Sequence, residues 1–197
     1  MGATERKARE RAEREQRIIT AAQAIAEREG WGAVTVRRLA EEIEYSQPVL
    51  YSHFANRDAI VTGVALQGFS EIAAVLQAAA EAAPTPEAAL AQVAAAYLAF
   101  AIDRAALYEA MFTLPTDLRF AKADTQPELR AAFAAMATVV ARFCTDPDLV
   151  TETFWAALHG FATLEGSGRI RPGARDERTA LLIQAVTGLR SRNRYFR

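Results

Sequence analysis

The sequence has little of the chemistry on which most enzymes and metalloproteins depend. It contains one cysteine, Cys144, which excludes an intramolecular disulfide, and two histidines, His53 and His159, far apart in the chain. These residues have no spacing typical of a metal site, and no phosphate-binding glycine loop or nucleophile motif is present. We therefore expect no catalytic residue, no metal and no cofactor.

Glycine and proline are also scarce, at 10 and 7 of 197 residues, and no alternation typical of a β-strand extends over a useful length. Hydrophobic residues make up 51% of the chain, which is enough to bury a full core. Alanine is abundant, and apolar residues recur at helical spacing. Together these features predict an all-α protein.

Charge and targeting signals set further limits. The formal net charge is -1, so any affinity for nucleic acid has to come from local basic clusters. The sequence shows neither a signal peptide nor an apolar run that indicates a membrane span. We expect a cytoplasmic protein without a membrane partner.

Residues 35–57 predict two short helices joined by a tight turn. Apolar residues at helical spacing indicate the first helix: Val36, Leu39, Ala40 and Ile43. The inner side of the second helix carries Val49, Leu50 and Phe54. Thr35 is the expected N-cap of the first helix and Ser46 that of the second, with Pro48 in its first turn. Such a helix-turn-helix can place its second helix in the major groove of DNA.

Polar residues of the second helix lie away from its apolar side and suit a DNA-binding surface. They are Gln47, Tyr51 and Ser52, with Arg37, Arg38, His53 and Arg57 beside them as base or phosphate partners. A packed helical hairpin, in which Ser46 and Gln47 only cap the helix and Tyr51 is half-buried, fits the same residues. The residue chemistry by itself leaves both alternatives open.

Residues 30–60 resemble the N-terminal domain of the TetR family of bacterial repressors. The resemblance rests on GWGAVTVRRLAEEIEYSQPVLYSHFANRDAI, in which a glycine-rich loop, an LA pair, an SQPxLYxHF core and an N-[KR]-[DE] sequence follow one another. The match extends from about residue 17 to residue 60. It implies a sequence-specific DNA-binding transcriptional regulator, typically a ligand-released repressor that binds a palindromic operator as a homodimer.

The resemblance also implies roles for single residues. Gln47, Pro48 and Tyr51 match recognition-helix positions that contact bases, Ser52 is a variable neighbour, and Arg37 matches a position that reaches a base edge. His53 and Arg57 match phosphate contacts, and Thr35 matches a cap near the DNA backbone. The predicted DNA-binding set is therefore Thr35, Arg37, Ser46, Gln47, Pro48, Tyr51, Ser52, His53 and Arg57.

Two residues of the turn depart from the family pattern. Glu44 stands where the family usually has glycine, at a cost of about 1 kcal/mol if the left-handed conformation is kept. Tyr45 replaces the usual small apolar residue. Both changes suggest a reshaped turn and a tilted second helix.

Residues 1–16 alternate basic and acidic side chains and form either a free arm or a solvated helix turn. An arm could approach a minor groove through its cations, namely Arg6, Lys7, Arg9 and Arg11. The interleaved glutamates favour ion pairs along a helix instead. An amphipathic helix over residues 17–29 follows, with Gly30 as its stop and Trp31 as a core residue of the three-helix unit.

We divide the chain functionally into two parts. Residues 1–55 form the arm and the DNA-binding domain, and residues 56–197 form a helical ligand-binding and dimerisation domain that starts with a connecting helix over residues 56–80. Asn56 caps that helix, and Gly63 and Gly68 within it predict close packing or a bend. Later helices are expected to begin at Thr85, Thr125 and Asp146.

The last two predicted helices are apolar on most of their circumference, which indicates burial from two sides. We interpret this as a four-helix dimer interface formed by Phe154, Leu158, Phe161, Leu182, Val186 and Leu189. A thick single-chain bundle is the alternative. A W-x-x-x-H-G element at Trp155, His159 and Gly160 resembles a C-terminal domain found in part of the same family, though less specifically.

The resemblance further implies a small-molecule site among the C-terminal helices, for an apolar or aromatic ligand. The bulky candidates for its wall are Tyr97, Phe100, Tyr108, Met111, Phe112, Phe120, Phe133, Met136 and Trp155. The same residues suit an ordinary core. The rival function is a non-enzymatic helical module that binds a ligand or a protein and no DNA, which the low net charge and Glu41, Glu42 and Glu44 favour.

Overall fold

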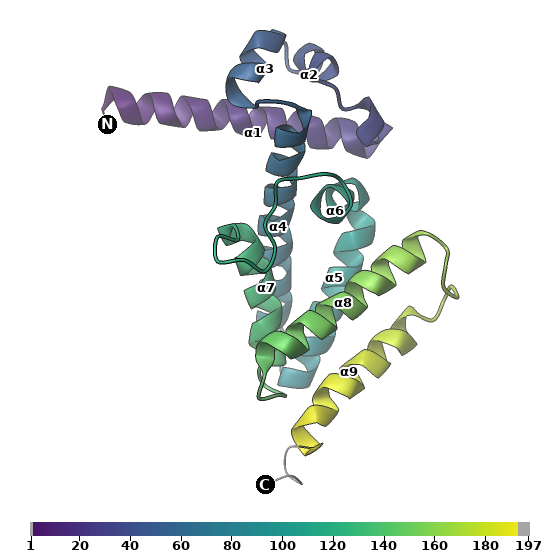
Figure 1. Cartoon of the computed structure of the whole chain (residues 1–197). Helices are drawn as coiled ribbons and strands as arrows, with labels where there is room; N and C mark the ends of the chain where they lie inside the picture. Colours follow the sequence, from purple (N-terminus) through teal and green to yellow (C-terminus); the bar gives the residue numbers. More distant parts are fainter. Residues whose placement is uncertain (1, 193–197) are drawn as a thin grey trace. The chain divides into compact units, whose positions relative to one another are not determined.

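The computed structural model describes residues 2–192. All regular secondary structure in this part of the chain is helical, as predicted. Figure 1 shows the helices in chain order. They are α1 (Ala3–Glu29), the short 3-10 turn η1 (Trp31–Ala33), α2 (Val36–Glu42), α3 (Gln47–His53), α4 (Arg57–Glu81), α5 (Pro86–Asp103), α6 (Ala105–Phe112), α7 (Pro127–Val140), α8 (Pro147–Gly166) and α9 (Arg175–Arg192).

The helices form two compact units. The first unit comprises Met1–Gly68 and Arg104–Thr125, and the second comprises Phe69–Asp103 and Gln126–Arg197. Packing therefore groups α6 and the start of α4 with the helix-turn-helix, whereas the functional division at residues 55 and 56 places them with the C-terminal part. That functional division stays a prediction.

The core of the first unit lies between α1, the helix-turn-helix and the start of α4. Its buried residues include Ile18, Ala22, Ile25, Leu39, Leu50, Ile60, Val61 and Val64. Trp31 is buried, as expected, and its indole Nε1 donates a hydrogen bond to the carbonyl of Ala106 at 2.8 Å. This bond ties the loop after α1 to α6, a partner that the sequence did not predict.

Helix α1 is longer than expected, because the charged residues before position 17 continue it toward the amino end. Three i,i+4 ion pairs line this extension: Arg6–Glu10, Arg9–Glu13 and Arg11–Glu15. The helical alternative for residues 1–16 is therefore the one observed. Gly30 ends the helix with a φ of 80°, a conformation that side-chain-bearing residues rarely adopt.

Most of the predicted caps are present. The side chains of Thr35, Asn56, Thr85 and Asp146 each accept a hydrogen bond from the backbone amide three residues later. Ser46 occupies the N-cap position of α3 without a side-chain capping bond. The helix start expected at Thr125 is wrong, because its hydroxyl bonds the backbone of Lys122 and closes a turn, so that α7 starts after Gln126.

The two glycines of α4 mark close packing, as predicted. A Cβ at Gly68 would lie 2.6 Å from Met111 Sδ, and one at Gly63 would lie 3.0 Å from Ile19 Cδ1. Both contacts are shorter than carbon packing allows without a shift of the neighbour. The glycines thus let α6 and α1 approach α4 in the first unit.

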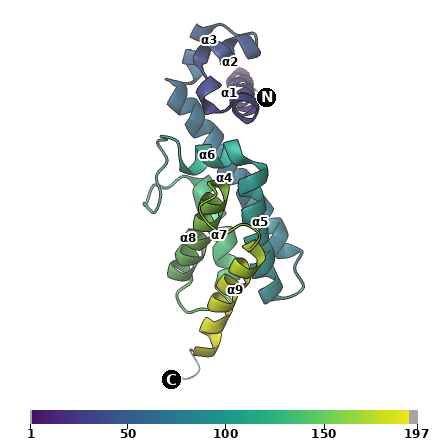
Figure 2. The same cartoon turned by 90° about the vertical axis from the view of Figure 1, so that its right-hand side faces the viewer.

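In the second unit α8 packs against α5, α7 and α9, and α9 also packs against α5 (Figure 2). A buried polar contact joins two of these helices, since Trp155 Nε1 donates to the Tyr97 hydroxyl at 3.0 Å. Glu165 at the end of α8 accepts hydrogen bonds from Arg175 and Arg178 of α9. Burial alone would raise the pKa of Glu165, but these hydrogen bonds outweigh it and lower that pKa, so the carboxylate stays charged and holds the two helices together.

One expected absence needs correction. By length and composition alone α4 qualifies as a membrane span, although the sequence had indicated none. Its apolar residues are used inside the protein instead, because Ile60 and Val64 are buried in the first unit and Ile72 and Leu76 in the second. Core packing is therefore a sufficient reason for its apolar composition.

Candidate nucleic-acid interface

Helix α3 presents one exposed side that carries most of the predicted base-contacting residues. Gln47, Pro48, Ser52 and Tyr51 are exposed, whereas Leu50 is only 1% exposed and anchors the helix to the core. Tyr51 is 53% exposed and is therefore not the half-buried packing residue of the hairpin alternative. The Ser52 hydroxyl donates to the carbonyl of Val49 at 2.7 Å, which leaves its oxygen as an acceptor.

Val49 was expected on the inner side of α3 and lies instead partly on its outer side, with 37% of its surface exposed. A seven-residue helix held mainly by Leu50 has room for only a narrow buried stripe. An exposed valine methyl on this side can contact the C5-methyl group of thymine. Val49 was not among the predicted DNA-binding residues, because an apolar side chain in a short helix is expected in the core.

Arg37 stands on α2 with 80% of its side chain exposed, and its nearest acidic partner is Glu41 at 3.7 Å. Such an exposed pair contributes little stability, so the guanidinium is available for another partner. Its neighbour Arg38 is held more firmly, by Glu29 and Glu42 at 3.2 Å each. Of these two arginines, Arg37 is the one suited to reach a base.

The structure gives His53 a partner inside the protein. Its side chain is only 6% exposed, and Nδ1 lies 3.3 Å from Glu15 Oε1 on α1. Glu15 also accepts a hydrogen bond from Arg11 Nε at 2.8 Å. His53 is therefore already engaged inside the protein, where it fastens the end of α3 to α1.

Arg57 likewise points into the protein. Its Nε donates to the carbonyl of Val34 at 2.8 Å and its Nη2 to the carbonyl of Trp31 at 2.7 Å. These carbonyls belong to the loop between α1 and α2, so Arg57 joins this loop to the start of α4. The planar guanidinium suits this two-point contact, so the geometry gives Arg57 a structural role within the protein.

The turn between α2 and α3 keeps the left-handed conformation although it has no glycine. Glu44 has a φ of 56°, and the amide of Tyr45 donates to the carbonyl of Ala40 at 2.9 Å. Arg17 on α1 donates to the Tyr45 hydroxyl at 3.0 Å and lies 5.9 Å from the centre of its ring. The expected reshaping of the turn does not occur, because Tyr45 gains a partner on α1 that holds the turn in place.

Glu44→Gly is expected to raise the free energy of unfolding by about 0.5–1 kcal/mol. Glycine relieves the left-handed strain of an L-residue, and the greater entropy of the unfolded glycine chain offsets part of that gain. Urea unfolding followed by circular dichroism measures the effect. Glu41→Gly, in the helical part of α2, is the control and should lower stability by about 1 kcal/mol. Equal losses in both variants would contradict the assignment of strain to Glu44.

The bulky residues proposed for a ligand pocket divide between the two units. Tyr108, Met111, Phe112 and Phe120 belong to the first unit, and Tyr97, Phe100, Phe133, Met136 and Trp155 belong to the second. Tyr108 and Phe112 pack together with ring centres 4.7 Å apart, and Tyr97 and Trp155 share a hydrogen bond. Several of the nine are fully buried, which suits core residues.

A groove of about 700 Å³ in the second unit is lined by none of these nine residues. It lies along α7, the end of α4 and the start of α5, and its walls are mainly small side chains, including Ala80, Ala89, Ala131, Ala134, Ala135 and Val139, with Gln77, Glu81 and Arg142 as polar groups. Small side chains leave the space that bulky ones fill. The predicted pocket residues were chosen because they are bulky, so none of them lines this groove.

Three of the residues proposed for the dimer interface are part of the protomer core. Phe154 and Leu158 are fully buried and Val186 is 5% exposed, because α8 and α9 pack against α5 and, for α8, against α7. Phe161, Leu182 and Leu189 remain partly exposed. Three further leucines of these helices are exposed and were not predicted in the interface: Leu149 and Leu164 on α8 and Leu181 on α9, at 59%, 38% and 65% exposure.

Comparison with known proteins gives matches over nearly the whole chain. Residues 18–64 match the bacterial regulatory proteins of the tetR family, and residues 90–189 match the tetracyclin repressor-like C-terminal domain. An uncharacterized HTH-type transcriptional regulator of Mycobacterium tuberculosis is 27% identical over 158 residues, which cover 77% of this chain and 69% of that protein.

Solved structures share the fold. A protein of unknown function from Rhodococcus sp. RHA1 has a TM-score of 0.72 at 23% identity, over 88% of this chain and 93% of that one. RolR in complex with resorcinol has a TM-score of 0.67 at 16% identity, over 93% and 94% of the two chains. The family matches decide against the module that binds no DNA. The chain belongs to the TetR family, whose members are non-enzymatic, DNA-binding transcriptional regulators.

Proposed function

We propose that this protein is a cytoplasmic repressor that binds a palindromic operator as a homodimer and releases it when a small apolar or aromatic ligand binds. The observation that carries the DNA part is the exposed side of α3, where Gln47 and Tyr51 face outward while Leu50 is buried. Arg37 stands on the adjoining helix with 80% of its side chain exposed, and its ion pair with Glu41, at 3.7 Å, is open to solvent.

The exposed side chains match the chemistry of base edges. A glutamine can bond adenine at two points, an arginine can bond guanine in the same way, and an apolar side chain can contact the thymine methyl group. We assign these contacts to Gln47, Arg37 and Val49, with Tyr51 beside them. His53 and Arg57 support α3 from behind and contact no DNA in this proposal.

Dimerisation supplies the second recognition helix. The partly exposed apolar residues of α8 and α9, Phe161, Leu164, Leu181, Leu182 and Leu189, are the candidates for a surface shared by two copies. Two copies related by a twofold axis would bind two half-sites about one helical turn apart, and the twofold symmetry requires the half-sites to form a palindrome.

Release of DNA by a ligand requires a site whose affinity for that ligand differs between the DNA-bound and the free state of the protein. The groove along α7 is one candidate site, and it has both an apolar wall and polar groups. The solved complex of RolR with resorcinol has the same fold, so helices in this arrangement can hold an aromatic molecule. This similarity supports an aromatic ligand without naming one.

Selection of DNA from a random-sequence pool, followed by gel shifts, tests the proposal. We expect a selected sequence with twofold symmetry, a complex that contains two protein chains, and binding that weakens steeply as salt rises. A panel of small phenols and other apolar compounds should include one that releases the DNA. Selection of no sequence, or equal affinity for the selected and scrambled duplexes, would contradict the proposed operator binding.

A further inference from the structure

Residues 1–68 carry ten basic and ten acidic side chains, so the DNA-binding helices have no net charge. Affinity for duplex DNA comes largely from cations that neutralise phosphates and release counterions. The cations that matter are therefore those that no acidic group in the protein already neutralises. Most arginines here have a carboxylate within 4.0 Å, namely Arg6, Arg9, Arg11, Arg28, Arg37, Arg38 and Arg57.

Lys7 and Arg14 differ from these arginines. Both are exposed, and within residues 2–192 neither has an ion pair or a hydrogen bond from its side chain. They are seven residues apart on α1, which is about two helical turns, so they share one side of the helix. Ile18, four residues after Arg14, continues the same stripe and is fully buried in the first unit.

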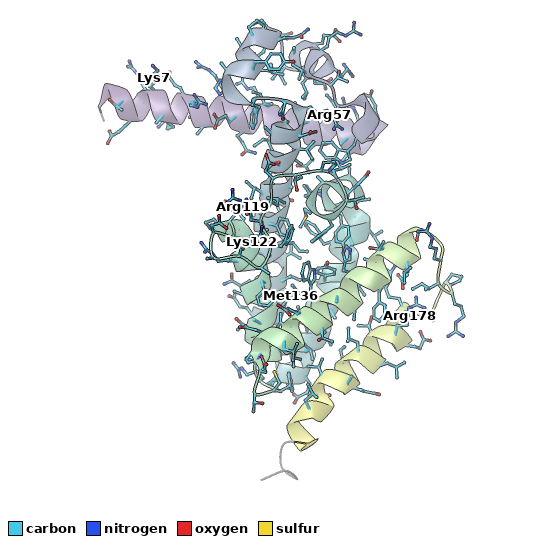
Figure 3. The ribbon with its side chains drawn as sticks, viewed as in Figure 1. Lys7, Arg57, Arg119, Lys122, Met136 and Arg178 are labelled. Atoms are coloured by element: carbon cyan, nitrogen blue, oxygen red, sulfur yellow. The ribbon has the colours of Figure 1, made fainter. Side chains whose placement is uncertain are left out.

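This stripe faces the helix-turn-helix. Figure 3 shows Lys7 on the side of α1 on which α3 lies. Ile18 and Arg14 are one turn apart on the same side of α1. This side is buried at Ile18, and nearer the amino end it carries the exposed cations Arg14 and Lys7. The two cations therefore lie on the side of α1 that faces α3, between α3 and the amino end of α1.

The amino-terminal half of α1 is fastened in this orientation. Arg11 Nη2 donates to the carbonyl of Ser52 at 3.5 Å, and Glu15 lies 3.3 Å from His53 at the end of α3. Gln16 donates to Gln67 on α4 at 2.8 Å. These contacts fix Lys7 and Arg14 relative to the recognition helix, so little conformational entropy is lost when they meet DNA.

We propose that Lys7 and Arg14 form a second DNA contact, to the phosphates of the duplex beside the segment that α3 reads. This inference rests on the proposed operator binding. A rise of 1.5 Å per residue separates the two Cα atoms by about 10 Å along α1, so the two side chains can reach different phosphates of one strand. The contact strengthens binding to every sequence alike, because phosphates carry no sequence information.

The test compares two double variants that remove equal charge. Lys7→Gln/Arg14→Gln removes the proposed contact, and Arg6→Gln/Arg9→Gln removes two paired cations from another side of the same helix. Circular dichroism confirms equal helix content. The affinity of each protein for the duplex selected by the wild type, and for a scrambled duplex, is then measured across a salt series.

Each lost phosphate contact should reduce the slope of log affinity against log salt by about 0.9, so a bound dimer of the first variant should lose about 3.6. The ratio of affinities for selected and scrambled duplexes should not change. If the slope does not change, or if both variants lose the same slope, Lys7 and Arg14 do not contact phosphates and the inference is overturned. The proposed function still stands in that case, provided that the wild type binds the selected duplex. Failure of the wild type to bind any duplex overturns both.

Discussion

Arg57→Ala is expected to lower the free energy of unfolding by about 3 kcal/mol. The change removes two charge-assisted hydrogen bonds, to the carbonyls of Val34 and Trp31, and each such bond contributes about 1.5–3 kcal/mol. The lower end of this range applies because the side chain is 35% exposed. The loop before α2 loses its attachment to α4, and α2 and α3 lose their fixed position with it.

Arg38→Ala is a matched control, because its side chain is 38% exposed but bonds only to the carboxylates of Glu29 and Glu42. Exposed ion pairs of this kind contribute about 1 kcal/mol or less. Arg57→Lys separates structure from charge, since lysine keeps the charge but cannot bond both carbonyls as a planar fork. Urea unfolding should rank Arg57→Ala and Arg57→Lys well below Arg38→Ala. Wild-type stability in Arg57→Ala, combined with a flatter salt dependence of DNA binding, would restore the phosphate role.

Gln47→Ala and Arg37→Ala are expected to weaken binding to the selected operator by about 1–3 kcal/mol each, and to leave binding to scrambled DNA unchanged. Both side chains are exposed, and neither contributes to the core, so the stability of the protein should not change. Each variant should also tolerate other bases at one position of each half-site. Fluorescence anisotropy with single-base operator variants measures this relaxation.

Gln92→Ala is the control for this pair, because it removes an exposed glutamine from α5 in the second unit. It should bind the operator like the wild type. If Gln47→Ala weakened binding to every duplex equally, Gln47 would be a phosphate contact and not a base contact. If neither variant changed binding, the exposed side of α3 would not be the recognition surface.

The two sets of arginine predictions show where sequence reasoning was limited. Arg37 and Arg57 stand in the same motif, and both were expected on the DNA. A long side chain can reach either solvent or a nearby carbonyl, and its residue type does not say which. The carbonyls of Val34 and Trp31 become partners of Arg57 only when the loop after α1 folds back toward α4.

The same limit applies to the dimer and ligand predictions. Periodicity correctly showed that α8 is apolar on most of its circumference, but it did not show which stripe faces α5 and α7. Phe154 and Leu158 therefore moved from the predicted interface into the core. The groove escaped prediction because it is defined by the small size of residues such as Ala131 and Ala135, which no motif marks.

The sequence by itself determined the helical class, the order of the helices, most of their caps and the helix-turn-helix, because these depend on residues within a few positions of one another. Thr35 and Asn56 cap their helices through amides three residues away, so their roles follow from the local pattern. Tertiary structure decided which charged groups are already paired, because Glu15 meets His53 and Arg17 meets Tyr45 only after distant segments pack together. Partners far apart in the chain have no fixed spacing in the sequence, so only the packed chain shows that Arg57 is engaged while Lys7 and Arg14 remain available.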